Sequence, residues 1–243
     1  MSMLSRFATL GGGGDPYWAS VKFLLVGNGA NGTNTNIIDS SSSPLTISNF
    51  GSTVISTAQS KFGSGSVAFN GTTQYLTVPS ATLSFTGNFT IEGWFYLSNN
   101  PATGLFKTLW AQRASDAGFG GPAVAFDSTG KFYLYISNSS ASGWDIIGFD
   151  TGMSTSIGSW QYIVLVKNGT SLTLYKNGSS TNIATSTSAI GASGATSIMT
   201  GSASGSVQNT DGYLYDFRIT NGIARYTGST MTVPTAPLPT YGP

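Results

Sequence analysis

The sequence predicts an all-β protein built as an antiparallel β-sandwich or jelly roll. Apolar and polar residues alternate with a period near two from Tyr17 onward, as in strands that bury one face. The alternating segments are short, rich in aromatic and β-branched residues, and bounded by Gly, Asn, Ser and Pro. No segment keeps the period of an amphipathic helix, so the chain is expected to contain strands and turns.

Fourteen segments fit the strand pattern. In chain order they are Val21–Val26, Thr53–Ser56, Ser66–Asn70, Gln74–Val78, Phe89–Leu97, Leu105–Arg113, Ala123–Phe126, Lys131–Ser137, Asp145–Phe149, Trp160–Lys167, Ser171–Lys176, Thr181–Thr185, Ser197–Gly201 and Tyr213–Thr220. Asn-Gly pairs at Asn70, Asn168 and Asn177 follow or join these segments, and both residues of such a pair tolerate the positive φ of a tight hairpin turn. Even spacing with turns between strands favours a sandwich.

The composition predicts one domain with a weakly charged surface. The chain has 243 residues, of which 40% are hydrophobic and 12% aromatic, which is enough for a large core. Only 8% are charged, against about 25% in an ordinary globular protein. Ser, Thr, Asn and Gly must therefore form most of the surface, which suits a permanent assembly or a surface that faces glycans.

Missing residue types exclude several classes of function. The net charge is +1 and the Lys and Arg residues are scattered, so we expect no nucleic-acid partner. The chain has no Cys and no His, which removes disulfides, thiol chemistry and the usual zinc sites. Nucleophile–base pairs of the Ser-His or Cys-His kind are excluded for the same reason.

Residues 1–16 are predicted to form a flexible N-terminal arm, followed by one domain over residues 17–243 with a Pro-rich tail. The arm carries apolar residues at Leu4, Phe7 and Leu10 before a run of four glycines. It lacks the long apolar run of a secretory signal, and no segment approaches the roughly 20 apolar residues of a membrane span. We therefore expect a protein made in a cytoplasm, with no membrane partner, that leaves it as part of a particle.

Several ordered segments resemble the concanavalin A-like jelly roll of the laminin G-like family. They are Trp18–Val26, Ile38–Ser41, Lys61–Gly71, Gln74–Pro79, Gly87–Trp94, Trp160–Lys167, Leu174–Gly178 and the closing motif Gly212–Gly228 with its Pro-rich exit through Pro234, Pro237 and Pro239. The form of the closing motif is similar to domains of tailed-phage virion proteins. The resemblance implies two curved antiparallel sheets packed face to face, a fold that hosts lectins, glycosidases and scaffolds alike.

The resemblance also directs attention to carboxylates. Retaining glucanases of this fold place two carboxylates on one strand face about 5 Å apart. Here the corresponding strand carries Glu92, the only Glu of the chain, without an Asp two or four positions later, so no enzyme is expected. A carboxylate pair assembled from distant Asp residues stays open as the alternative. The strand of Arg218 neighbours this strand in the family fold, and we predict a partly buried Glu92–Arg218 ion pair that holds the closing strand in register.

Calcium is common in relatives, so no cofactor is expected other than a calcium ion bound by Asp residues at loops. The candidate metal ligands are Asp39 and Asp211, drawn from the set Asp39, Asp116, Asp127, Asp145 and Asp211. None of these residues falls in a dense acidic cluster. Asp in β-loops also forms turns without any metal, and this alternative stays open.

Aromatic side chains are the best candidates for sugar contact, because flat rings stack on the apolar faces of pyranoses. Tyr133 and Tyr135 share one strand face, and Trp144 lies in a loop and is expected to be exposed. The alternative for the two tyrosines is ordinary packing on the sheet. Trp110 and Trp160 lie within apolar strands and are expected in the core.

Two functional hypotheses result. The first is a phage virion structural protein, a capsid decoration or other particle-surface protein that contacts further virion proteins through its arm and its weakly charged surface. The second is a glycan-binding module of a tail fibre or spike that recognises host surface glycans. Both are compatible with a homo-oligomer, because weakly charged sheets and edges associate readily.

Overall fold

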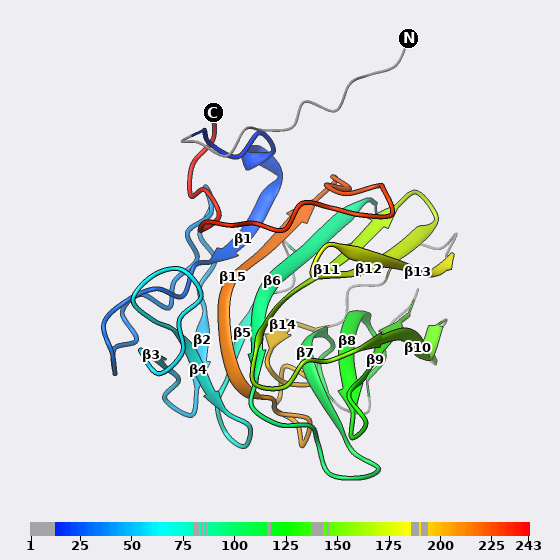
Figure 1. Cartoon of the computed structure of the whole chain (residues 1–243), viewed down its shortest axis with the longest axis horizontal. Helices are drawn as coiled ribbons and strands as arrows, with labels where there is room; N and C mark the ends of the chain where they lie inside the picture. The colour runs from blue at the N-terminus through cyan, green and yellow to red at the C-terminus, as the bar shows by residue number, and fades with distance from the viewer. Residues whose placement is uncertain are drawn as a thin grey trace.

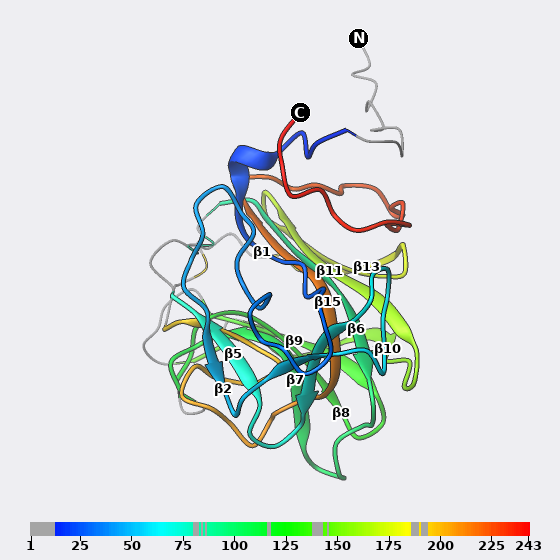
Figure 2. The ribbon, with the colours of Figure 1, turned by 90° about the vertical axis from the view of Figure 1, so that its left-hand side faces the viewer.

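The computed structural model describes residues 13–79, 83, 85, 87–115, 118–137, 143–144, 146–185, 190 and 194–243. Within these ranges fifteen strands and one short 3-10 helix form two antiparallel sheets packed face to face (Figures 1 and 2). The chain is thus the all-β antiparallel sandwich that the sequence predicts. None of the described residues forms a helix long and apolar enough to cross a membrane.

The large sheet contains the closing strand near its centre. Its order is β13 (Ser179–Thr185), β12 (Ser171–Lys176), β11 (Trp160–Asn168), β6 (Phe89–Leu97), β15 (Asp211–Asn221), β4 (Ser66–Asn70) and β3 (Val54–Ser56), and β1 (Val21–Leu25) also pairs with β15. The 3-10 helix η1 (Trp18–Ser20) leads directly into β1. The small sheet has the order β10 (Ile146–Ser154), β9 (Lys131–Ile136), β8 (Gly121–Asp127), β7 (Phe106–Gln112), β14 (Thr196–Ile198), β5 (Tyr75–Val78) and β2 (Ser48–Phe50).

The core lies between the two sheets and is strongly aromatic. Phe95 and Phe217 of the large sheet face Trp110 of the small sheet, with Trp110 ring centroids 5.7 Å from Phe95 and 5.8 Å from Phe217. All three side chains are fully buried. Each such side chain contributes on the order of 2 kcal/mol by leaving water, so this layer fixes how the two sheets sit on each other.

All fourteen predicted segments overlap a strand, but three details differ. The sequence analysis missed β2, because its three residues Ser48–Phe50 are all exposed and show no apolar alternation. Strand β10 runs on to Ser154, beyond the predicted end at Phe149. Strand β14 stops at Ile198 because the next residue, Met199, has a φ of 63° and turns the chain.

A buried cluster of four charged side chains connects the large sheet to both ends of the described chain. Glu92 on β6 and Arg218 on β15 are direct cross-strand neighbours, with Arg218 Nη2 2.6 Å from Glu92 Oε1. Asp15 lies 2.7 Å from Arg218 Nη1 and 2.8 Å from Arg225 Nη2 through its Oδ2. The four side chains are at most 7% exposed, and their two negative and two positive charges balance.

Two tyrosines complete the environment of Glu92. The hydroxyls of Tyr162 and Tyr226 donate to Glu92 Oε2 at 2.7 and 2.8 Å. Burial raises the pKa of the Glu92 carboxyl, but Arg218, Arg225 and the hydrogen bonds outweigh this effect and hold the pKa below its ordinary value. Glu92 is therefore a buried, fully engaged carboxylate.

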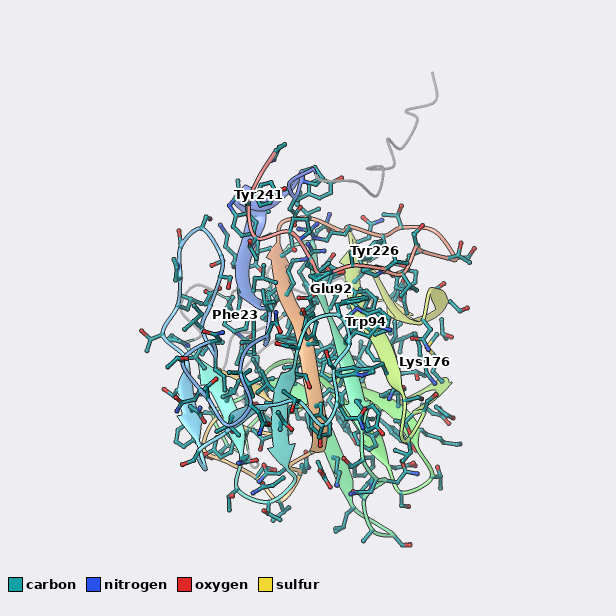
Figure 3. All side chains as sticks on the ribbon, turned by 60° about the vertical axis from the view of Figure 1, so that its left-hand side comes forward. Phe23, Glu92, Trp94, Lys176, Tyr226 and Tyr241 are labelled. Carbon is teal, nitrogen blue, oxygen red and sulfur yellow. The ribbon has the colours of Figure 1, made fainter. Side chains whose placement is uncertain are left out.

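The C-terminal segment covers the outer face of the large sheet. Ala224, Tyr226, Met231 and Val233 pack against a second buried cluster on that face, which contains Trp94, Tyr162, Val164, Val166, Tyr175 and Tyr215. Figure 3 shows Tyr226 of this segment close to Glu92 and Trp94 of β6. The Pro-rich exit, predicted only as a tail, also packs on the sandwich, because Leu238 is buried against Val21 and Leu24 of β1.

Asp15, which the sequence analysis assigned to the flexible arm of residues 1–16, belongs to the folded domain. Asp15 is 1% exposed, pairs with Arg218 and Arg225, and donates its backbone N–H to Tyr241 O at 2.8 Å. Its local sequence, a Gly run followed by Asp-Pro, is typical of a linker. The sequence did not reveal the role of Asp15, because its partners Arg218 and Arg225 lie 203 and 210 residues away. Residues 1–12 lie outside the described ranges.

Asp216 fixes the far end of the C-terminal segment. It occupies a bulge between Tyr215 and Arg218 with a φ of 52°, and it is fully buried. Its Oδ2 accepts a hydrogen bond from Leu238 N at 2.8 Å, whereas its Oδ1 has no partner among the described residues. Burial raises its pKa from 3.8 to about 7, against the lowering effects of the Leu238 N–H and Arg218.

This raised pKa predicts a pH-dependent stability. The folded state holds the Asp216 proton more tightly than the unfolded chain, so the stabilising contribution is complete below a pH near 3.8 and is lost as pH rises through about 7. The variant Asp216→Asn is neutral at every pH and tolerates the left-handed backbone. In urea unfolding, the free energy of unfolding of the variant minus that of the wild type should rise by a few kcal/mol between about pH 4 and pH 7 and stay constant at higher pH. An equal difference at about pH 4 and pH 8 would contradict this assignment.

Candidate functional site

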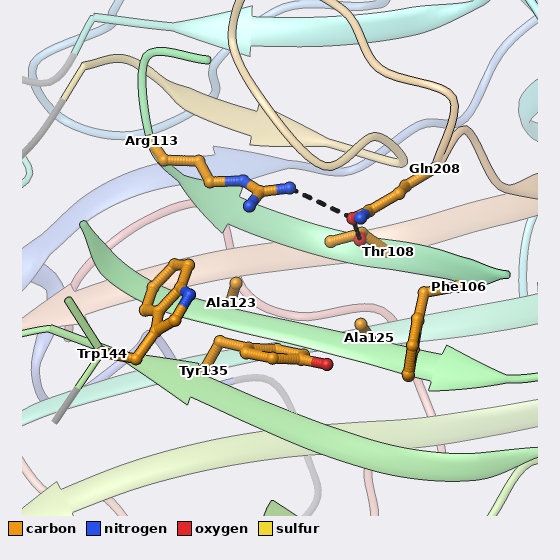
Figure 4. Close-up of a pocket in the computed structure, with 8 residues that line it drawn as sticks. All are labelled: Phe106, Thr108, Arg113, Ala123, Ala125, Tyr135, Trp144 and Gln208. Atoms are coloured by element: carbon orange, nitrogen blue, oxygen red, sulfur yellow. Dashed lines mark hydrogen bonds between the residues drawn. The ribbon is translucent and has the colours of Figure 1, made fainter. Parts of the chain in front are cut away.

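A pocket opens on the outer face of the small sheet. Its volume is about 100 Å³, and Figure 4 shows its lining, made of Phe106, Thr108, Arg113, Ala123, Ala125, Tyr135, Trp144 and Gln208. Strands β7, β8 and β9 supply most of these residues. The pocket therefore stands on a rigid sheet rather than on loops alone.

Strand alternation explains the floor and one wall of the pocket. On β9, Leu134 and Ile136 are buried in the core, so Tyr135 between them points to the outer face. Ala123 of β8 is the cross-strand neighbour of Tyr135. Because Ala123 and Ala125 are small, they leave a depression between the larger side chains of β7 and β9.

Aromatic rings form the apolar walls. Trp144 packs against Tyr135 with centroids 5.6 Å apart and against Phe119 with centroids 5.3 Å apart. Phe106 meets Tyr133 edge-on at 5.2 Å and Tyr135 at 6.2 Å. Trp144, expected to be exposed, is instead partly buried by these neighbours.

The structure brings together the three aromatic residues that the sequence singled out, but in unequal positions. Tyr135 and Trp144 line the pocket, whereas Tyr133 is not among its lining residues, contacts Phe106 and donates its hydroxyl to Asp127 Oδ2 at 3.1 Å. Burial raises the pKa of the Tyr135 hydroxyl, so this group stays protonated at neutral pH. Tyr135 therefore offers a hydrogen-bond donor and acceptor beside its ring.

A polar wall, missed by the sequence analysis, faces the rings. Gln208 Oε1 accepts hydrogen bonds from Thr108 Oγ1 at 2.9 Å and from Arg113 Nη2 at 3.2 Å. The Arg113 guanidinium lies 6.0 Å from the Trp144 ring centre. Arg113 and Gln208 are 95 residues apart, so no local pattern signals that they meet.

The remaining predicted site residues lie elsewhere. Glu92 and Arg218 belong to the buried cluster of the large sheet. Asp39 accepts hydrogen bonds from Leu24 N, Ser41 N and Leu45 N at 2.8–2.9 Å, and Asp211 accepts one from Asn99 Nδ2 at 2.8 Å. Both carboxylates thus bind neighbouring protein groups.

The other Asp candidates give a similar result. Asp127 binds Thr129, Lys131 and Tyr133, and Asp116 and Asp145 lie outside the described residues. Within the described part of the chain, no three His, Cys, Asp or Glu side chains gather as a metal site requires. Trp110 lies in the core, whereas Trp160, also expected there, is half-buried against Tyr96.

The fold and the site define a lectin-like jelly-roll protein, and the comparison with family models gives the same class. The model described as the concanavalin A-like lectin/glucanases superfamily matches residues 70–224. The match spans more than half of the chain, so the protein belongs to this superfamily. No curated protein sequence matches the chain.

Solved structures with the same fold are distant in sequence. The binding domain of Paraclostridial Mosquitocidal Protein 1 aligns with 88% of this chain and 51% of its own, at 16% identity and a TM-score of 0.65. The binding domain of botulinum neurotoxin serotype C1 aligns with 84% of this chain and 49% of its own, at 12% identity and a TM-score of 0.60. This chain therefore spans about half the length of both binding domains.

A third structure matches over nearly its whole length. Domain 4 of an extracellular arabinanase from Geobacillus stearothermophilus, solved in complex with arabinotriose, aligns with 84% of this chain and 94% of its own. The identity is 14% and the TM-score 0.58. At such identities the three likenesses establish the fold.

Proposed function

We propose that this protein is a glycan-binding module that holds a sugar in the pocket formed by Tyr135, Trp144, Arg113 and Gln208. The observation that carries the proposal is the division of the pocket into aromatic and polar walls. A pyranose or furanose ring has an apolar face that packs on aromatic rings and hydroxyls that need hydrogen-bond partners. The Tyr135 and Trp144 rings serve the first need, and Gln208, Arg113 and Thr108 serve the second.

The structural neighbours support the same ligand class. One neighbour is the arabinanase domain solved with arabinotriose. Another comes from botulinum neurotoxin type C, whose cell entry depends on interaction with two ganglioside molecules. Both ligands carry sugars, and both proteins share the fold at low identity.

Binding without catalysis is part of the proposal. Glycoside hydrolysis normally requires two carboxyl groups flanking the scissile bond. The eight described residues that line the pocket include no Asp or Glu. Glu92 is 0% exposed, belongs to the other sheet and is held by Arg218, Tyr162 and Tyr226, so it does not meet a ligand in the pocket.

We also propose that the domain is displayed on a virus particle, as a capsid decoration or other particle-surface protein made in the host cytoplasm. Asp15 donates its backbone N–H to Tyr241 O, and in Figure 1 the C-terminus lies beyond one end of the large sheet, whereas β7, β8 and β9 lie toward the opposite end. A particle contact near Asp15 would leave the pocket facing outward. Quantitative mass spectrometry of purified particles should find the protein in many copies, and its absence from particles would overturn this placement.

The glycan proposal predicts a specific loss of binding in the variant Trp144→Ala. On a glycan array, and by calorimetry with the best array ligand and with arabinotriose, its affinity should fall roughly tenfold or more, because one of the two ring walls disappears. Tyr241→Ala is the matched control, since Tyr241 is 53% exposed and belongs to the C-terminal segment. Thermal unfolding of both variants checks that they are folded.

The pocket assignment fails if Trp144→Ala binds as tightly as the wild type. A wild-type protein that binds no glycan on the array would contradict the function itself. Gln208→Ala separates the two walls, because it removes a polar partner without changing the rings.

A further inference from the structure

A second aromatic platform lies on the same face of the small sheet as the pocket. Phe50 of β2 stacks on Tyr75 of β5, with ring centroids 4.4 Å apart and an angle of 8° between the planes. Phe50 is 39% exposed even though its ring is paired. Tyr75 covers one face of the Phe50 ring, so the exposed part of that ring is available to a ligand.

Strand alternation places this platform on the outer face. Leu76 and Val78 of β5 are buried in the core between the sheets, so Tyr75 and Thr77 point outward. Phe50 is the cross-strand neighbour of Tyr75 and shares its face. Tyr135 reaches the same face by the same argument from β9.

The two aromatic sites are separated by four strand spacings. The order β9, β8, β7, β14, β5 places Tyr75 roughly 19 Å from Tyr135 across the sheet. This span exceeds a single sugar unit several times. One ligand that touches both sites must therefore be a chain of sugars running across the strands.

A polar loop fills the space between the two sites. Thr77 and Ser197 point outward from β5 and β14 yet are at most 7% exposed, and Ser197 Oγ donates to Thr200 O in the loop of residues 199–208. A Cβ added at Gly205 would lie 3.0 Å from the Tyr75 hydroxyl, and Gln208 at the other end of the loop lines the pocket. The loop thus contacts both aromatic sites.

Exposed side chains gather around this face. Seven large hydrophobic side chains are exposed among the described residues, and three of them, Phe50, Leu105 and Val207, belong to segments that border the outer face of the small sheet. Leu105 precedes Phe106, and Val207 precedes Gln208, so both flank the pocket. Ser204 and Val207 of the loop are also exposed, so the loop offers a ligand both a hydroxyl and an apolar side chain.

We propose that Phe50 and Tyr75 form a distal subsite for a glycan chain whose other end occupies the Tyr135–Trp144 pocket. The inference rests on the proposed glycan-binding function and adds the ligand class, an oligosaccharide or polysaccharide long enough to cross four strand spacings. Short sugars fill only the pocket. Longer chains gain a second aromatic contact and bind more tightly.

Calorimetric titration with four homologous series of oligosaccharides tests this subsite. Arabino-, chito-, manno- and galacto-oligosaccharides are each measured from the disaccharide to the octasaccharide. The wild-type affinity should rise roughly three- to tenfold once the chain is long enough to reach Phe50, the gain expected from one further aromatic contact. The variant Phe50→Ala should lose this gain and bind the short sugars as the wild type does.

Further variants make the result specific. Phe50→Tyr keeps a flat ring and should retain the gain with chain length, whereas Tyr241→Ala, which changes an exposed ring in the C-terminal segment, should leave binding of all sugars unchanged. Trp144→Ala should weaken short and long sugars alike. Phe50 lies on a three-residue edge strand and packs mainly on Tyr75, so its replacement should change the thermal midpoint only slightly.

The outcomes separate the two proposals. If short sugars bind in the pocket but affinity does not rise with length, or if Phe50→Ala keeps the gain, the distal subsite is overturned and the pocket assignment stands. If Trp144→Ala has no effect on any sugar, the pocket is wrong and the chain-spanning arrangement falls with it. Absence of binding to all four series overturns both proposals.

Discussion

The contact between Glu92 and Arg218 is the interaction on which the rest of the structure depends. It lies at the centre of the large sheet, where β6 and β15 pair, and is buried with Asp15 and Arg225. Removing one member of such a cluster would leave an unpaired buried charge, which typically costs about 3–5 kcal/mol. Through Asp15 and Arg225 the same cluster holds the N-terminal residues and the C-terminal segment against the sheet. Phe217, next to Arg218 in the chain, packs on Trp110, so the register of the closing strand also positions the small sheet.

The two outer faces of the sandwich differ, because the C-terminal segment covers only the face of the large sheet. The C-terminal segment covers the large sheet, and its apolar side chains pack on Trp94, Tyr162 and Tyr215. The small sheet carries the pocket and the Phe50–Tyr75 stack on its outer face, with the loop of residues 199–208 between them. Ala123 and Ala125 on β8 form the floor of the pocket, and the larger aromatic side chains on β7 and β9 border it. The outer face of the large sheet thus serves stability, and in our proposal the outer face of the small sheet binds the ligand.

The sequence predicted those features that depend on a strand pattern. Tyr135 was identified because it alternates with Leu134 and Ile136, and Glu92 was paired with Arg218 because their strands are neighbours in the family fold. Asp15, Arg225 and Gln208 escaped prediction, since their partners are distant in the chain and their local sequences resemble ordinary linkers or turns. Strand β2 was missed because three exposed residues have no buried face that would impose a period. Long-range polar contacts, and an edge strand whose residues are all exposed, are features that only the assembled fold reveals.

The central claim is that the outer face of the small sheet binds sugar between the Tyr135–Trp144 rings and the Gln208 wall. A crystal structure of the protein with a bound oligosaccharide tests it most directly. The account predicts a sugar ring packed on Trp144 or Tyr135 with a hydroxyl hydrogen-bonded to Gln208 or Arg113. A sugar bound instead on the outer face of the large sheet, with the pocket unchanged and unoccupied, would contradict it.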